Sequence, residues 1–147
     1  MHVAPRMSKT YPKLTEWLWE NMPKVVGKKK VFDAFVKYSE LSASTANSVL
    51  TKCTANPVID FDSMPGANGE FRGSTMPNHV YLAKSICEKF ENNPEDAKKP
   101  EMHILIESTV LHEMVHWGDW KDGKDQPDEE GKSFEKAAYG KDINRYW

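Results

Sequence analysis

The sequence contains only two cysteines, Cys53 and Cys87, which are too few for a disulfide-stabilised scaffold. We expect both to be free, buried thiols. No apolar run reaches the length of a membrane-spanning helix, so no membrane span is expected. Residues 1–14 also lack the apolar stretch of a signal peptide.

The chain also has little net charge: the formal value is −2, and the pI is near 6.2. This excludes a generally basic nucleic-acid-binding protein, because few phosphates could be neutralised. The mean hydropathy is −0.69, yet five Trp, six Phe and five Tyr can build one compact core and argue against disorder. From the length we expect one domain over residues 1–147, with residues 1–12 as a flexible tail.

The first third of the chain carries apolar residues at helical spacing. One helix is predicted over 14–22 and ends before Pro23. A second is predicted over about 28–41, and Ser42 or Ser44 would cap a third. The chain therefore begins with a helical layer.

Beyond residue 57 the pattern changes from helical to extended. Val58–Phe61 alternates as a strand does, and Glu70–Arg72 and His79–Ala83 are further strand candidates. Gly- and Pro-containing turn dipeptides separate the first two. A short helix over 84–90 and a polar loop over 92–100 follow, which completes a small sheet of about three strands.

The most apolar stretch begins at Pro100, which suits the first turn of a helix. Its apolar residues occupy nearly every side, as in a central, buried helix, and Gly118 is the predicted end. A last helix is predicted from about 128 to 139, ending at Gly140. The predicted fold class is α+β.

The buried helix contains the motif H-E-x-x-H at residues 112–116. His112 and His116 are four positions apart and share a helix face, so both imidazoles can reach one metal ion at about 2.0–2.1 Å. Glu113 lies one step round the helix, where it can act as general base on a metal-bound water. Two His and a Glu inside an apolar helix would be costly without a partner, and a metal supplies one.

A catalytic zinc needs a third protein ligand and one open position for water. The following residues are the acidic candidates: Asp119, Asp122, Glu130 and Glu135. Asp122 stands where the last ligand of a metzincin motif would stand, but Asp119 replaces the Gly of that motif and no later Met exists. Asp119 could instead orient a ligating His. Gly131 and Ala138 flank Glu135 on its helix and would permit a close approach to the metal.

The segment 131–140, G-K-S-F-E-K-A-A-Y-G, resembles the second motif of the aspzincins, G-T-x-x-D-x-x-Y-G. Here Glu replaces Asp, and Tyr comes one residue later. The segment is more similar to the F-E-x-x-A-Y-G ending of bacterial metallopeptidase toxin domains, the C-terminal zincin domains of polymorphic toxins and type VI secretion effectors. Trp-Gly-Asp at 117–119 adds to the similarity, which covers residues 104–140.

This resemblance implies the following site residues: zinc ligands His112, His116 and Glu135, general base Glu113, and oxyanion stabiliser Tyr139. For Tyr139 the alternative is an aromatic side chain that packs at the helix end. The resemblance also implies a zincin-like fold, in which an edge strand pairs with an extended peptide. Either Glu70–Arg72 or His79–Ala83 could supply that edge.

The resemblance further implies a zinc-dependent endopeptidase that acts as a bacterial toxin or effector. Its substrate would be a protein or peptide, and a cognate immunity protein would be a natural partner. Delivery into a target cell by a secretion system would explain the missing signal peptide. Two other functions remain open: a non-catalytic, metal-stabilised binding module with an inert Glu113, and a housekeeping zinc peptidase.

Overall fold

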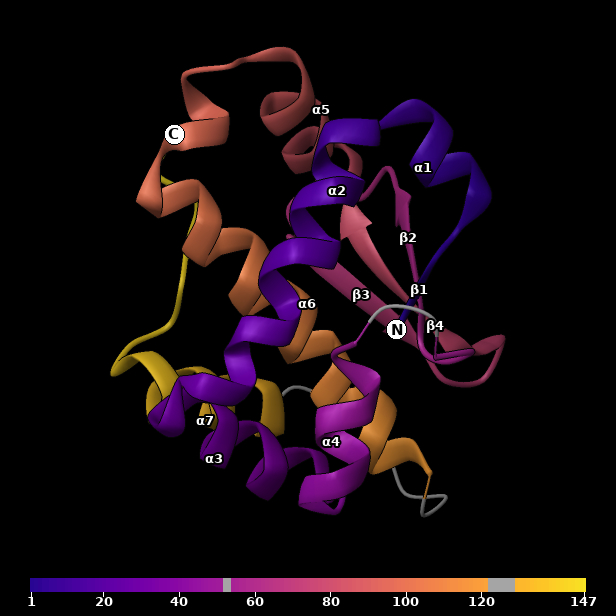
Figure 1. Ribbon diagram of the computed structural model, residues 1–147, viewed down its shortest axis with the longest axis vertical. Coiled ribbons are helices and arrows are strands. Elements are labelled where there is room, and N and C mark those ends of the chain that lie inside the picture. Colours follow the sequence, from indigo (N-terminus) through magenta and orange to yellow (C-terminus); the bar gives the residue numbers. More distant parts are fainter. Residues whose placement is uncertain (52–53, 122–128) are drawn as a thin grey trace.

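A small mixed sheet and one long helix form the centre of the computed structural model, which describes residues 1–51, 54–121 and 129–147 (Figure 1). The elements in chain order are β1 (His2–Val3), α1 (Pro5–Thr10), α2 (Pro12–Asn21), η1 (Met22–Gly27), α3 (Lys29–Ser39), α4 (Ala43–Val49), β2 (Val58–Asp62), β3 (Gly69–Arg72), β4 (Met76–Ala83), α5 (Lys84–Asn92), η2 (Asp96–Lys98), α6 (Pro100–Trp120) and α7 (Glu129–Tyr139). The predicted α+β class is confirmed.

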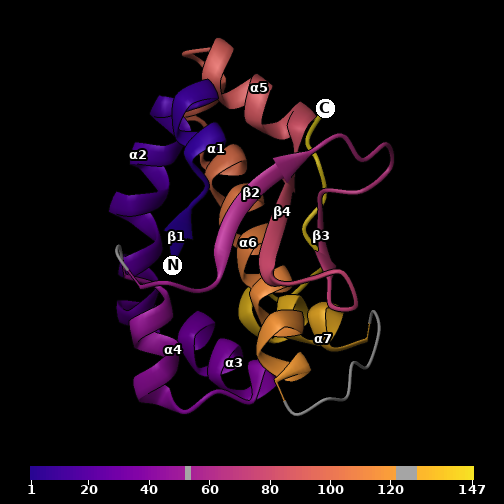
Figure 2. The ribbon, with the colours of Figure 1, turned by 90° about the vertical axis from the view of Figure 1, so that its right-hand side faces the viewer.

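The strands lie in the order β1-β2-β4-β3, so the strand that follows β2 in sequence lies at the far edge. β1 and β4 each pair with β2 in parallel, and β3 pairs with β4 in antiparallel fashion. Ile59 and Val80 are register partners, and both side chains are buried. Their face of the sheet packs against α6, which lies behind the sheet in Figure 2.

Residues 1–12 are folded against the core, so the prediction of a flexible tail is wrong. β1 pairs with β2, and Pro5 begins α1. Met1 and Met7 are fully buried. The apolar side chains of this segment are too few to show a period, and only the pairing with a strand more than fifty residues away reveals its place.

Helix α6 is buried along nearly its whole length, as its apolar pattern predicted. The prediction that it ends at Gly118 is wrong, because the helix continues to Trp120. A Cβ at Gly118 would lie 2.6 Å from the carbonyl oxygen of Ser39. This glycine therefore permits close packing of α6 against the end of α3.

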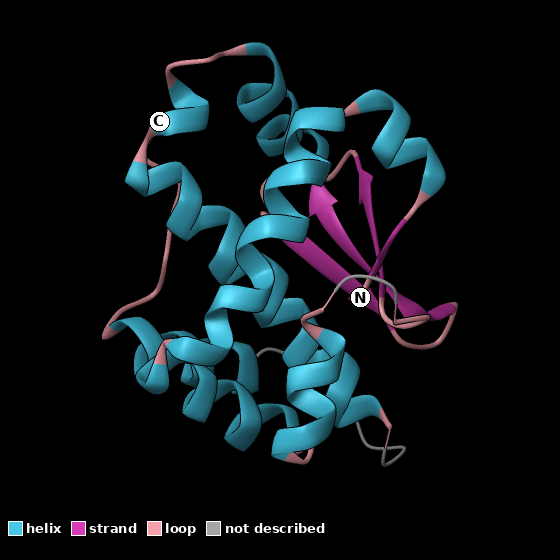
Figure 3. Ribbon diagram, viewed as in Figure 1, coloured by secondary structure: helices cyan, strands magenta, loops and turns pink. Residues whose placement is uncertain are grey.

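Helices α3 and α7 lie below the sheet, where they pack against each other and against α6 (Figure 3). Phe35 of α3 meets Phe134 of α7 edge to face, with ring centroids 6.5 Å apart, and both side chains are fully buried. This contact holds α7 against α3.

Cys87 is a free, buried thiol as predicted, and burial raises its pKa well above the usual range. Cys53 lies outside the described residues. Within the described ranges, no helix combines the length and the apolar character that crossing a membrane requires.

Candidate active site

Helix α6 presents the H-E-x-x-H side chains to two different neighbours. His112 faces α7, and Glu113 faces β3. The imidazole rings of His112 and His116 lie one turn apart, with centroids separated by 5.1 Å. Glu113 and His116 are each only 7% exposed, and His112 is half-buried. The helical spacing thus brings both imidazoles to one side of α6.

Glu135 of α7 lies directly against His112. Its Oε2 atom is 2.6 Å from Nδ1 of His112, and its Oε1 atom accepts a hydrogen bond of 3.0 Å from the backbone N–H of Ile143. The side chain is 8% exposed. A buried carboxylate is therefore held beside the first imidazole of the motif by contacts to both of its oxygens.

Gly131 explains how α7 comes so close to α6. A Cβ at this position would lie 2.2 Å from Nε2 of His112 and 2.4 Å from its Cε1. No side chain can occupy that space while His112 keeps its position. The absence of a side chain at Gly131 is thus what allows Glu135, one turn later, to reach the imidazole.

The edge strand β3 lies along the same part of α6. A Cβ at Gly69 would lie 2.7 Å from Cγ2 of Thr109 and 3.0 Å from Cγ of Glu113. The order of strands also decides which predicted strand forms the sheet edge: it is β3, with Glu70–Arg72, because β4 is paired on both sides.

A cavity of about 380 Å³ opens between these elements. The residues that line it come from the β2–β3 loop, the start of β3, α6, α7 and the segment after α7: Gly66, Ala67, Asn68, Gly69, Thr109, His112, Glu113, Lys132, Glu135 and Ile143. The cavity therefore joins His112, Glu113 and Glu135 in one concave site beside the edge strand.

Tyr139, the predicted oxyanion stabiliser, is bonded to another residue of α6. Its hydroxyl donates a 2.7 Å hydrogen bond to Oε2 of Glu107, whose Oε1 lies 2.5 Å from Nζ of Lys28. Burial, and then the charge of Glu107, raise the pKa of Tyr139 far above its usual value. The ring borders a neighbouring cavity rather than the one lined by Glu113.

The other acidic candidates lie in three different settings. Asp119 is buried on α6 near its C-terminal end, with 3% of its surface exposed. Glu130 is half-buried at the start of α7. Asp122 lies outside the described residues. Glu135 is in contact with an imidazole of the motif.

The donor chemistry of the site fits a zinc ion, although the donors are not arranged as a formed centre. Within residues 1–51, 54–121 and 129–147, no three His, Cys, Asp or Glu side chains already surround one point. Two imidazoles and one carboxylate are, however, a donor set of catalytic zinc sites. The residues that would supply it, His112, His116 and Glu135, come from one turn of α6 and the adjoining face of α7.

Some cavity-lining residues have no signal in the sequence. Lys132 and Ile143 reach the site only because α7 and the following segment fold back onto α6. The loop residues 66–69 are different, since their Gly-rich turn sequence marked a loop beside a strand without indicating what it faces.

The sequence matches the family described as Metallopeptidase toxin 3 over residues 7–140. The chain belongs to this family, and it is a metallopeptidase toxin domain. The family is one of peptidases, whose substrates are proteins and whose class requires a metal. No curated protein and no solved structure matches the chain.

Proposed function

We propose that the chain is a zinc-dependent endopeptidase that acts as a bacterial toxin or effector. The observation that carries this proposal is the concave site in which His112 and Glu113 of α6 meet Glu135 of α7 beside an edge strand. This arrangement brings imidazole, a carboxylate base and a second carboxylate to a cavity large enough for an extended peptide segment.

His112, His116 and Glu135 would hold the metal. The Oε2 atom of Glu135 lies 2.6 Å from Nδ1 of His112, so the carboxylate is beside the motif, and the two atoms would move apart to about 3.3 Å to share one tetrahedral ion. When bound, zinc would supply Lewis-acid polarisation of the scissile carbonyl and would lower the pKa of a coordinated water. Because only the carboxylate of Glu135 is charged and both imidazoles are neutral, such an ion would remain electrophilic.

A second role for Glu135 is the orientation of His112 through Nδ1, a common arrangement around metal-binding histidines. In that case Nε2 would be the binding atom of His112. Nε2 lies so close to α7 that the space beside it would not hold the Cβ of a residue at Gly131. The 2.6 Å contact at Nδ1 fits the orienting role, and the close approach of α7 to Nε2 fits the ligand role, so the nature of the contact between Glu135 and the metal decides between the two.

Glu113 would be the general base. Its side chain lines the cavity, and its Oε1 lies 3.9 Å from Nε2 of His112, so it is beside the proposed metal site without occupying it. In this position it can take a proton from the attacking water and pass that proton to the leaving amine. Oxyanion stabilisation by Tyr139 would require its hydroxyl to leave Glu107.

The substrate strand would lie along β3. This strand is paired only with β4 in the described sheet, and it packs against α6 at Glu113. An extended peptide added to its outer edge would therefore pass the proposed base, with backbone hydrogen bonds giving affinity independent of sequence. Delivery into a target cell and protection of the producer by an immunity protein belong to the same proposal.

Expression in a bacterial host tests the proposal in its biological form. We expect the wild-type chain to arrest growth and the Glu113→Gln variant, at equal expression, to be harmless. A housekeeping peptidase would be tolerated in both forms. A non-catalytic binding module would give the same phenotype with and without the base, and this result would overturn the proposal.

A further inference from the structure

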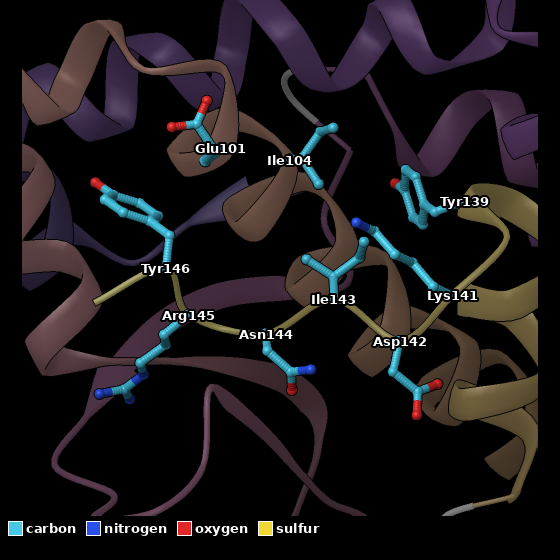
Figure 4. A pocket seen from close by; sticks show the side chains of 9 residues that line it. All are labelled: Glu101, Ile104, Tyr139, Lys141, Asp142, Ile143, Asn144, Arg145 and Tyr146. Atoms are coloured by element: carbon cyan, nitrogen blue, oxygen red, sulfur yellow. The ribbon is translucent and has the colours of Figure 1, made fainter.

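The segment of residues 141–147 lies outside the part of the chain that matches the family, yet it borders the candidate site. It leaves α7 and runs past α6 in an extended conformation (Figure 4). In this view the side chains of Lys141, Ile143 and Tyr146 lie on one side of the backbone, and those of Asp142 and Asn144 on the other. The segment thus presents its two faces to two different surroundings.

Ile143 connects this segment to the proposed metal site. Its backbone N–H donates a 3.0 Å hydrogen bond to Oε1 of Glu135. It lines the site cavity of about 380 Å³ and also the neighbouring cavity of about 450 Å³, which is drawn in Figure 4. The segment therefore forms the wall between the two cavities at the position of Glu135.

Arg145 connects the same segment to the loop that precedes β3. Its Nε donates to Oδ1 of Asn68 at 2.8 Å, and its Nη2 donates to the carbonyl oxygen of Ala67 at 3.0 Å. The backbone oxygen of Asn68 accepts a hydrogen bond from Ala83 at the end of β4. Residues 67–68 are consequently fixed on one side by the sheet and on the other by Arg145.

The far end of the segment is also anchored. The hydroxyl of Tyr146 donates a 2.6 Å hydrogen bond to Oδ1 of Asp96, whose carboxylate also pairs with Lys89 and Lys99. The Tyr146 hydrogen bond, more than any other contact, lowers the pKa of Asp96. Arg145 thus extends from a segment that is held at both ends, by Glu135 and by Asp96.

We propose that Arg145 is a positioning residue for substrate binding. It fixes loop residues 67–68 against the candidate site and thereby sets the start of β3, the strand on which the peptide would pair. This inference rests on the proposed function, and it assigns a role at the substrate-binding edge to a segment beyond the family match. Its guanidinium suits this role, because two fixed donors satisfy two acceptors of one loop at once.

The test compares Arg145→Ala with a matched control, Arg6→Ala. Arg6 uses the same two donors: Nε donates to a side-chain oxygen of Asp60, and Nη2 donates to the backbone oxygen of Phe61. Both acceptors belong to β2 and do not line the site cavity. With a fluorescence-quenched peptide library as substrate, we expect Arg145→Ala to raise KM about three- to tenfold at unchanged kcat and zinc content. Arg6→Ala should leave KM unchanged.

Two further variants show whether loss of the contact with Asn68 causes the rise in KM. Lys at position 145 can satisfy one acceptor of the loop, so Arg145→Lys should recover part of the loss in KM. Asn68→Ala in the Arg145→Ala background should add less than it does alone, because both changes remove the same contact. Equal KM changes in the Arg145 and Arg6 variants, or a KM unaffected by Arg145→Ala, would overturn the inference.

Amide hydrogen exchange separates this inference from the proposed function. In Arg145→Ala the amides of residues 67–71 should exchange at least about tenfold faster than in Arg6→Ala, whether or not the chain hydrolyses peptides. Unchanged exchange would show that Arg145 does not fix the loop. Absence of Glu113-dependent hydrolysis with accelerated exchange would refute the proposed function alone.

Discussion

Gly131 and His112 are so close that a single added methyl group cannot fit between them: a Cβ at Gly131 would lie 2.2 Å from Nε2 of the imidazole. This contact lets α7 bring Glu135 to within hydrogen-bonding distance of the H-E-x-x-H helix. The proposed metal site thus depends on the absence of a side chain as much as on its donor atoms.

Gly131→Ala should therefore displace α7 or the His112 ring. We expect a loss of about 1–3 kcal/mol in the free energy of unfolding, as for other overpacked sites, together with weaker zinc binding. Gly27→Ala is the matched control, because a Cβ at Gly27 meets no atom within 4 Å. Its effect should stay below about 1 kcal/mol. Chemical denaturation and metal titration of both variants check this, and equal effects would remove the packing role of Gly131.

Removal of either motif histidine should abolish stoichiometric zinc binding. His112→Ala and His116→Ala each remove one of three proposed ligands, whereas the wild-type chain should bind about one zinc per molecule. His103→Ala is the control on the same helix, since Nε2 of His103 is engaged with the carbonyl oxygen of Ala97. Elemental analysis after dialysis gives the comparison, and full zinc retention in both motif variants would exclude this site.

Glu135→Ala should weaken zinc binding sharply, and Asp122→Ala should have little effect. X-ray absorption of the zinc-loaded wild type distinguishes the two roles of Glu135. A ligand role predicts two imidazoles and one carboxylate at the ion, and this carboxylate is lost in Glu135→Ala. A spectrum unchanged by Glu135→Ala, with affinity reduced about 10- to 100-fold, would instead identify Glu135 as the carboxylate that orients His112.

Tyr139→Phe separates anchoring of α7 from oxyanion stabilisation. Loss of the hydroxyl leaves Oε2 of the buried Glu107 without that donor, so we expect a cost of about 1–3 kcal/mol in stability at neutral pH. Turnover should change little, because the hydroxyl is bonded to Glu107. A fall in kcat of about 10²-fold or more at unchanged stability would support the oxyanion role.

The same variant should alter the pH dependence of stability. Burial keeps Tyr139 neutral in the folded state above its ordinary pKa of 10.0, whereas in the unfolded chain it ionises there. Because the pKa of Tyr139 is raised in the folded state, the stability that this residue contributes is fully present below pH 10 and is lost as the pH rises further. Wild-type stability should therefore fall more steeply above pH 10 than that of Tyr139→Phe, in denaturation measured at pH 9 to 11.

Features with a local period could be predicted from the sequence, and features that depend on distant contacts could not. The burial of α6 and the shared face of His112 and His116 follow from 3.6 residues per turn. The edge position of β3 depends on the strand order, which no local pattern contains. β1 has no local pattern, because a strand of two residues is too short to alternate.

The surroundings of the site illustrate the same limit. Similarity to a motif predicts Tyr139 at the site, but its hydrogen-bond partner Glu107 comes from the N-terminal half of α6. Arg145 and Asn68 are 77 residues apart, and neither carries a pattern that links it to the other. A glycine such as Gly118 signals a helix end locally, and only its contact with Ser39 shows that it serves packing.

Hydrolysis by the Glu113→Gln variant tests the central claim most directly. The substitution keeps the shape of the side chain and removes its basic oxygen, so the purified variant should retain about one zinc and the wild-type unfolding transition. Its turnover of a peptide library should fall at least about 10²-fold relative to wild type. Wild-type turnover by a zinc-loaded, folded Glu113→Gln protein would contradict the assignment of Glu113 as the base of a metallopeptidase.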